Sequence, residues 1–159
     1  MSIVKVHRYG VRTDWKEGKR VTLTAPGKPG LDVAFPSDFA NGVPGVWSPE
    51  ELLIASLATC FELTVIALAE RKQVPLREIR VDATGHVEHR GHLYELILLE
   101  LDVHAETEAA REHDLERIAH MAHEGCIVGN ALDVPVRLTI VPSTGAADDG
   151  GAARSTSVP

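Results

Sequence analysis

Aromatic residues are scarce in this chain of 159 residues, which contains three Phe, two Trp and two Tyr. The length suits a single domain with a real hydrophobic core, and that core must consist mainly of Leu, Ile, Val and Ala. We expect this domain to span residues 1–142. Residues 143–159 are rich in Gly, Ala, Ser and Asp, offer little to pack, and are expected to form a disordered tail.

A signal sequence is also not expected, because residues 1–9 contain no apolar segment. Basic residues are in the minority: 16 Lys and Arg against 23 Asp and Glu give a net charge of −7. That balance disfavours nucleic acid and anionic membranes as partners. We therefore expect a soluble, cytoplasmic protein with no nucleic-acid partner and no membrane partner.

Cysteine is limited to Cys60 and Cys126. In a reducing compartment a permanent structural disulfide between them is not expected, and a chain of this size folds without one. The simplest interpretation is two packed thiols that act as small hydrophobic residues. The alternative is a pair with redox chemistry.

The stretch between Pro49 and Pro75 contains neither Gly nor Pro and predicts one long helix with Cys60 near its middle. Ser48 is a favourable N-cap, Pro suits the first helical position, and Glu51 completes a capping box three residues later. Basic residues precede Pro75, which ends the helix.

Apolar side chains surround most of this expected helix, so it should be buried in a core. Its four Glu residues argue against a membrane span; they are Glu50, Glu51, Glu62 and Glu70. One sheet and one further helix would cover only part of its circumference. We therefore expect a homodimer in which a partner subunit covers the rest.

The remaining pattern predicts strands around two helices. Alternating or short apolar runs indicate strands at Ile3–Arg8, Arg20–Thr24, Leu31–Phe35, Glu78–Glu88, Tyr94–His104 and Val134–Val141. A second helix is expected at Glu108–Glu124, and its apolar stripe continues to Cys126. The order predicts an α+β fold with antiparallel sheets packed on both helices. The apolar stripe of the second helix should also direct Cys126 toward the central helix.

Two segments resemble the motifs of the OsmC/Ohr family of thiol-dependent peroxidases. They are Ser48-Pro49-Glu50-Glu51-Leu52-Leu53 with Ala55, Ala58 and Thr59-Cys60-Phe61, and Glu124-Gly125-Cys126-Ile127-Val128-Gly129-Asn130-Ala131-Leu132. The resemblance implies two intertwined α+β subunits with active sites at the dimer interface. It also implies reduction of organic hydroperoxides to alcohols.

The resemblance further implies a role for each matching residue. Cys60 matches the peroxidatic cysteine, which becomes a sulfenic acid, and Cys126 matches the resolving cysteine, which forms a disulfide with Cys60. A dithiol of the dihydrolipoyl type, free or on a lipoylated protein, would reduce that disulfide, so no bound cofactor is expected. Glu50 matches the glutamate that holds a catalytic arginine from the N-terminal region.

A reactive Cys60 needs a nearby cation, because apolar surroundings raise the pKa of a thiol. The central helix supplies none within a turn, so the cation must come from elsewhere. Arg20 is the first choice, with Arg12, Lys16 and Lys19 as alternatives.

Glu50 lies ten residues before Cys60, about 15 Å along a straight helix. We therefore expect a composite site in which one subunit contributes both cysteines and the other contributes Glu50 and the arginine. The alternative for Glu50 is a purely structural acid at a helix N-terminus.

Two other functions remain open. His120, His123 and Cys126 are spaced by three residues, which raises the possibility of a metal-binding module, although the usual zinc spacing is missing and no metal is expected. A dimer that binds a small apolar ligand without catalysis is the other alternative. If the protein is a peroxidase, apolar surroundings at Cys60 favour an organic hydroperoxide over hydrogen peroxide.

Overall fold

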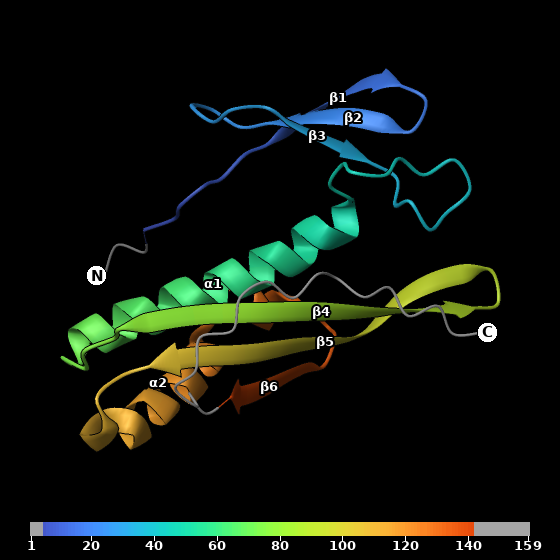
Figure 1. Cartoon of the computed structure of the whole chain (residues 1–159). Coiled ribbons are helices and arrows are strands. Elements are labelled where there is room, and N and C mark those ends of the chain that lie inside the picture. Colours follow the sequence, from blue (N-terminus) through green and yellow to red (C-terminus); the bar gives the residue numbers. More distant parts are fainter. Residues whose placement is uncertain (1–4, 142–159) are drawn as a thin grey trace.

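The structure is a computed structural model that describes residues 5–141 (Figure 1). Its strands and helices are β1 (Arg12–Glu17), β2 (Arg20–Thr24), β3 (Leu31–Ala34), α1 (Pro49–Arg71), β4 (Glu78–Arg90), β5 (Leu93–Glu106), α2 (Glu112–Gly125) and β6 (Val136–Val141). Short 3-10 turns occupy Ala109–Arg111 and Gly129–Ala131. The predicted α+β class is confirmed. The expected tail, residues 143–159, lies outside the described residues.

Helix α1 begins where the sequence predicts, and its capping box is formed. The Ser48 hydroxyl accepts a hydrogen bond from the Glu51 N–H at 3.1 Å, and the Glu51 carboxylate accepts one from the Ser48 N–H at 2.7 Å. These two bonds satisfy amides that the first turn of a helix leaves without partners. The helix then runs unbroken for 23 residues to Arg71.

Only one side of α1 is buried within the chain. Leu57, Phe61, Val65 and Ala69, spaced by four residues, form its buried stripe. This stripe packs into a core with α2 and the β4–β6 sheet, whereas Leu63 on another side is 65% exposed. By length and composition alone α1 could cross a membrane, but the core helix of a soluble protein meets the same criterion. Within one chain, the sheet and α2 therefore cover only part of α1, as the sequence predicts.

The larger sheet has the order β4-β5-β6, and α1 and α2 lie on one of its faces (Figure 1). Strands β4 and β5, which match two of the predicted strands, form an antiparallel hairpin. Strand β6 pairs with β5 in parallel, from Leu99↔Val136 to His104↔Val141, so the sheet is mixed rather than wholly antiparallel. The reason lies in the connection: α2 carries the chain back along the sheet, and such a crossover returns a strand in its original direction.

Gly85 on β4 allows α1 to approach the sheet closely. A Cβ atom at this position would lie 2.7 Å from Ile54 Cδ1 and 3.2 Å from Leu96 Cδ1, closer than side-chain carbons pack. A larger residue here would require the ends of the Ile54 and Leu96 side chains to shift.

The first three strands form a separate small sheet near the N-terminal end of α1, away from β4–β6 (Figure 1). The prediction of a first strand at Ile3–Arg8 is wrong, since residues 5–8 belong to no strand and β1 begins at Arg12. The tight turn at Gly18, with φ +50°, joins β1 to β2 and pairs Arg12 with Thr24. The alternation of apolar and polar residues in 3–8 therefore does not indicate which residues pair with β2.

Candidate functional site

Cys60 and Cys126 are brought together where α1 packs against the end of α2. Cys60 lies in the middle of α1 and is half-buried, and Cys126 follows the last residue of α2 and is 1% exposed. Both cysteines are reduced, and both belong to the same hydrophobic core. The Cys60 thiol is close enough to raise the pKa of Cys126. The predicted direction of Cys126 toward the central helix is therefore confirmed.

Burial has the largest effect on Cys126 and raises the pKa of its thiol, because a thiolate loses hydration in apolar surroundings. The Gly129 N–H donates a hydrogen bond to Cys126 Sγ at 3.4 Å, which favours the thiolate and opposes this rise. The Cys60 thiol adds to the rise. Cys126 is therefore a protonated thiol at neutral pH, held beside Cys60.

The backbone around Cys126 is held by the turn that follows it. The Asn130 N–H donates to the Cys126 carbonyl at 2.9 Å, and the Asn130 side-chain Nδ2 donates to the Glu124 carbonyl at 2.8 Å. The sequence does not predict these two hydrogen bonds. Apart from the turn-forming Gly129-Asn130 pair, it contains no local signal for them.

Cys60 has a different environment. Its backbone carbonyl accepts a hydrogen bond from the Thr64 hydroxyl at 2.7 Å. Within residues 5–141 no charged side chain forms a hydrogen bond or ion pair with Cys60. Within the described residues of one chain, no cation is therefore bonded to this thiol.

Glu50 is not brought to Cys60 of its own chain. It lies exposed in the first turn of α1, and because the helix is unbroken the two residues are separated by about 15 Å along the axis. Glu50 instead lines a cavity of about 860 Å³ bounded by residues 36–48, the start of α1 and the β4–β5 hairpin.

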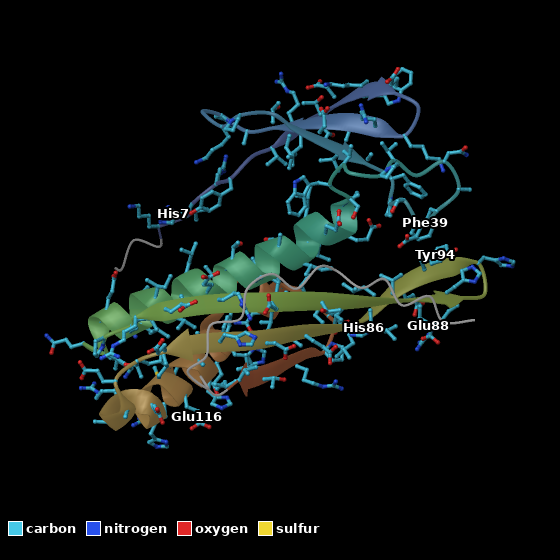
Figure 2. All side chains as sticks on the ribbon, in the orientation of Figure 1. His7, Phe39, His86, Glu88, Tyr94 and Glu116 are labelled. Carbon is cyan, nitrogen blue, oxygen red and sulfur yellow. The ribbon has the colours of Figure 1, made fainter. Side chains whose placement is uncertain are left out.

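An aromatic contact closes one side of this cavity. Phe39 meets Tyr94 edge to face with 4.7 Å between ring centroids, and Figure 2 shows Phe39 on its loop above Tyr94 on the hairpin. Phe35 and His89 extend this contact on either side. No local pattern predicts it, because Phe39 and Tyr94 are far apart in the sequence.

Arg20 lies on β2 in the small sheet, away from the middle of α1 (Figure 1). The alternative cations differ in whether they already form an ion pair or a hydrogen bond. Lys16 forms an ion pair with Asp32 at 3.0 Å, and Lys19 donates to the Ala40 carbonyl and lies over the Phe35 ring. Within residues 5–141, Arg20 and Arg12 form no side-chain hydrogen bond or ion pair. The contacts within one chain do not distinguish Arg20 from Arg12, and the assignment of Arg20 to Cys60 stays a prediction.

The histidines of the metal alternative lie on α2. His120 is exposed, whereas Cys126 is buried. In the described part of the chain no three His, Cys, Asp or Glu side chains form a group that could hold a metal ion. On the hairpin, His86 contacts Glu100 at 2.6 Å.

The fold and the two adjacent thiols define an α+β protein with a cysteine pair between its helices. A model of the OsmC-like protein family matches residues 42–141, and the chain belongs to this family. Glu50, Cys60 and Cys126 lie within the matched residues, and Arg20 lies outside them. A comparison with curated proteins finds no match.

Several solved structures have a similar fold. An OsmC-like protein of unknown function from Vibrio cholerae superposes with a TM-score of 0.77 at 17% identity, covering 86% of this chain and 100% of that chain. An organic hydroperoxide resistance protein OsmC from Legionella pneumophila gives 0.71 at 23% identity, covering 86% and 98%. An organic hydroperoxide resistance protein from Elizabethkingia anophelis gives 0.69 at 19% identity, covering 87% and 98%.

Proposed function

We propose that this protein is a thiol-dependent peroxidase that reduces organic hydroperoxides to alcohols and serves in the response to oxidative stress in the cytoplasm. The observation that carries this proposal is the juxtaposition of Cys60 and Cys126 in one core. Membership of the OsmC-like family and the hydroperoxide resistance proteins among the similar structures are consistent with it.

The reaction begins with the Cys60 thiolate. It attacks the peroxide oxygen farther from the alkyl group; the new S–O bond forms as the O–O bond breaks, and the alkoxide leaves as the alcohol after taking a proton. Cys60 is then a sulfenic acid. Cys126 attacks the Cys60 sulfur, the S–S bond forms, and the hydroxyl of the sulfenic acid leaves as water. A dithiol of the dihydrolipoyl type, free or on a lipoylated protein, reduces the disulfide and becomes oxidised itself.

The activating groups come from a second copy of the chain. Glu50 lies too far from Cys60 of its own helix, and one side of α1 stays exposed within the chain. In a homodimer, Glu50 of one subunit holds Arg20 beside the Cys60 thiol of the other subunit. The cation stabilises the thiolate, which is the nucleophile.

A peroxidase assay with tert-butyl hydroperoxide and reduced lipoamide tests the proposal. Cys60→Ser removes the nucleophile and should abolish turnover. Cys126→Ser leaves the first oxidation intact but blocks the disulfide, so one peroxide per subunit is consumed and turnover stops. Titration of free thiols before and after stoichiometric cumene hydroperoxide should show the loss of both. Turnover that survives Cys60→Ser, or retention of both thiols, contradicts the mechanism.

The cation is tested separately. Arg20→Met should slow oxidation of Cys60 by about 100-fold, since a buried charge partner typically contributes a few kcal/mol to a thiolate. Arg12→Met is the matched control, because it removes a similar cation from the same sheet. A greater loss in Arg12→Met than in Arg20→Met would reassign the role to Arg12.

A second candidate is a dimer that binds a small apolar ligand without catalysis. It is favoured by the cavity of about 860 Å³, which is lined in part by Phe39, Trp47 and Tyr94. Titration of the fluorescence of Trp47 with an apolar alcohol detects such binding in a Trp15→Phe background. Binding together with an inert Cys60 would favour this candidate over the peroxidase.

A further inference from the structure

We propose that Asn130 is a positioning residue that holds Cys126 in the geometry required to attack oxidised Cys60. This inference rests on the proposed peroxidase cycle. It concerns the second step of that cycle, the closure of the disulfide, and not the attack on the peroxide.

Cys126 needs support from outside α2, because it lies just beyond the end of the helix. Helix α2 ends at Gly125, and Cys126 has an extended backbone with φ −69° and ψ 112°. Nothing lies within 4 Å of a Cβ atom built on Gly125, so packing does not restrain the residue that precedes the cysteine. Gly also has the greatest backbone freedom of any residue. Other contacts must therefore set the direction of the Cys126 thiol.

Asn130 supplies contacts on both sides of this hinge. Its side-chain Nδ2 donates to the Glu124 carbonyl at 2.8 Å, one of the last carbonyls of α2, which the helix itself leaves without a partner. Its backbone N–H donates to the Cys126 carbonyl at 2.9 Å. Asn130 thus joins the end of α2 to the cysteine that follows it.

The same turn also contacts the other cysteine's helix. A Cβ atom on Gly129 would lie 3.4 Å from Leu57 Cδ1, and Leu57 is buried on α1 one turn before Cys60. The Gly129 N–H donates to Cys126 Sγ at 3.4 Å. The turn from Gly129 to Asn130 therefore lies against α1, bonds to Cys126 and is tied to α2, so it relates the two thiols to each other.

Closure of the disulfide depends strongly on such positioning. The two Cα atoms must lie within about 7 Å, and the bond tolerates only a narrow dihedral range. A displacement of about 1 Å from a reactive geometry can slow a step by about 100-fold. A sulfenic acid that waits longer is exposed to a second peroxide, which oxidises it to sulfinic acid.

The test compares Asn130→Ala and Asn130→Asp with Glu124→Gln. The first two variants remove the side-chain donor, and Asp keeps the shape of Asn. Glu124→Gln alters a neighbouring side chain but keeps the backbone carbonyl that accepts the bond. Because Asn130 is exposed, all three variants should fold. Asn130→Ser, a shorter donor, is expected to restore part of the lost rate.

We expect Cys60 to become a sulfenic acid at the wild-type rate in every variant. Disulfide closure should slow by about 10- to 100-fold in Asn130→Ala and Asn130→Asp and stay unchanged in Glu124→Gln. Dimedone trapping measures the sulfenic acid, and mass spectrometry measures the disulfide and the sulfinic acid formed at excess peroxide. The fraction of Cys60 oxidised to sulfinic acid should rise in proportion to the delay in disulfide closure.

Three outcomes would overturn the inference. Closure at the wild-type rate in Asn130→Ala and Asn130→Asp would show that Asn130 does not position Cys126, with the peroxidase function intact. An equal slowing of both steps, or unfolding of both variants, would show a general structural role. If wild-type protein forms neither sulfenic acid nor disulfide, the proposed function itself fails.

Discussion

The body of the molecule, which consists of α1, α2 and β4–β6, buries more apolar side chains than the N-terminal sheet of β1–β3. In the body, α1, α2 and β4–β6 share one core in which Phe61, Leu99 and Ile118 are fully buried. In the N-terminal sheet, every residue of β1 is exposed, and burial is complete only at the end of β3. The body is stabilised by apolar burial within the chain. In the small sheet, only Val33 and Ala34 are buried within the chain.

This difference separates the chemistry into two parts. Both thiols lie in the body, where packing brings them together without help from another chain. Arg20 and its rivals lie on the sheet, and Glu50 lies where the connecting loop enters α1. In the proposed peroxidase, the cation for the thiol must therefore come from the sheet of another subunit.

The largest expected effect compares a core ring with an exposed one. Phe61→Ala should lower the free energy of unfolding by about 3–5 kcal/mol, since it leaves a cavity in the middle of the body. Trp15→Ala on β1 should cost less than about 1 kcal/mol, because Trp15 is 74% exposed. Urea unfolding followed by circular dichroism measures both. A loss as large for Trp15 as for Phe61 would break the comparison and show that assembly buries the sheet.

A smaller effect compares two glycines. Gly85→Ala should destabilise the protein by about 1–3 kcal/mol, because the added methyl group would meet Ile54 Cδ1 at 2.7 Å. Gly10→Ala, at a position with no atom within 4 Å of the added carbon, should change stability by less than about 0.5 kcal/mol. Thermal unfolding of the two variants checks the contrast. Equal stability would mean that the end of the Ile54 side chain moves aside without cost.

Ser48 lies where the chain passes from the N-terminal sheet into α1, and its N-cap makes a measurable contribution to the free energy of unfolding. Ser48→Ala removes the hydroxyl that accepts the Glu51 N–H and should cost about 1 kcal/mol. Ser56→Ala, on the exposed side of the same helix, should be neutral or slightly stabilising, because Ala is the better helix former. The urea midpoints of the two variants separate capping from helix propensity. A similar loss in both would remove the cap as an explanation.

The smallest expected effects are two changes of stability with pH, one from each region, and they have opposite signs. Burial raises the pKa of Cys126, so its contribution is complete below the ordinary thiol pKa of about 8.5 and is lost as pH rises through the higher folded value. The Lys16 hydrogen bond lowers the pKa of Asp32, so that contribution is present above about pH 4 and is lost as pH falls.

Urea midpoints of the reduced protein across pH measure both contributions. Cys126→Ser should flatten the alkaline side, and Asp32→Asn should flatten the acid side. An alkaline slope that persists in Cys126→Ser would assign the titration to another group.

Local features were predictable because their causes lie within a few residues. Ser48, Pro49 and Glu51 mark the start of α1, and both this start and the capping box are confirmed. The apolar stripe of α2 likewise predicts the burial of Cys126. The roles of Glu50 and Arg20 stay predictions, since they concern groups that one chain does not bring to Cys60.

Pairing between distant segments was less predictable. Residues 3–8 alternate as a strand would, yet β1 begins at Arg12, because the turn at Gly18 selects the residues that face β2. The cavity beside Glu50 and the contact between Phe39 and Tyr94 depend on a loop meeting a hairpin tip. Neither segment contains a local mark of the other.

The sequence by itself determined where α1 begins and which side of α2 faces the core, because a cap and apolar periodicity act within a turn or two of the chain. It did not determine the start of α2, which is Glu112 and not the expected Glu108, because residues 109–111 form a 3-10 turn. Only the tertiary structure decided that β6 runs parallel to β5, that Asn130 joins the end of α2 to Cys126, and that Cys126 lies beside Cys60. Those relations depend on how helices pack against the sheet, which is a property of the whole core and of no single segment.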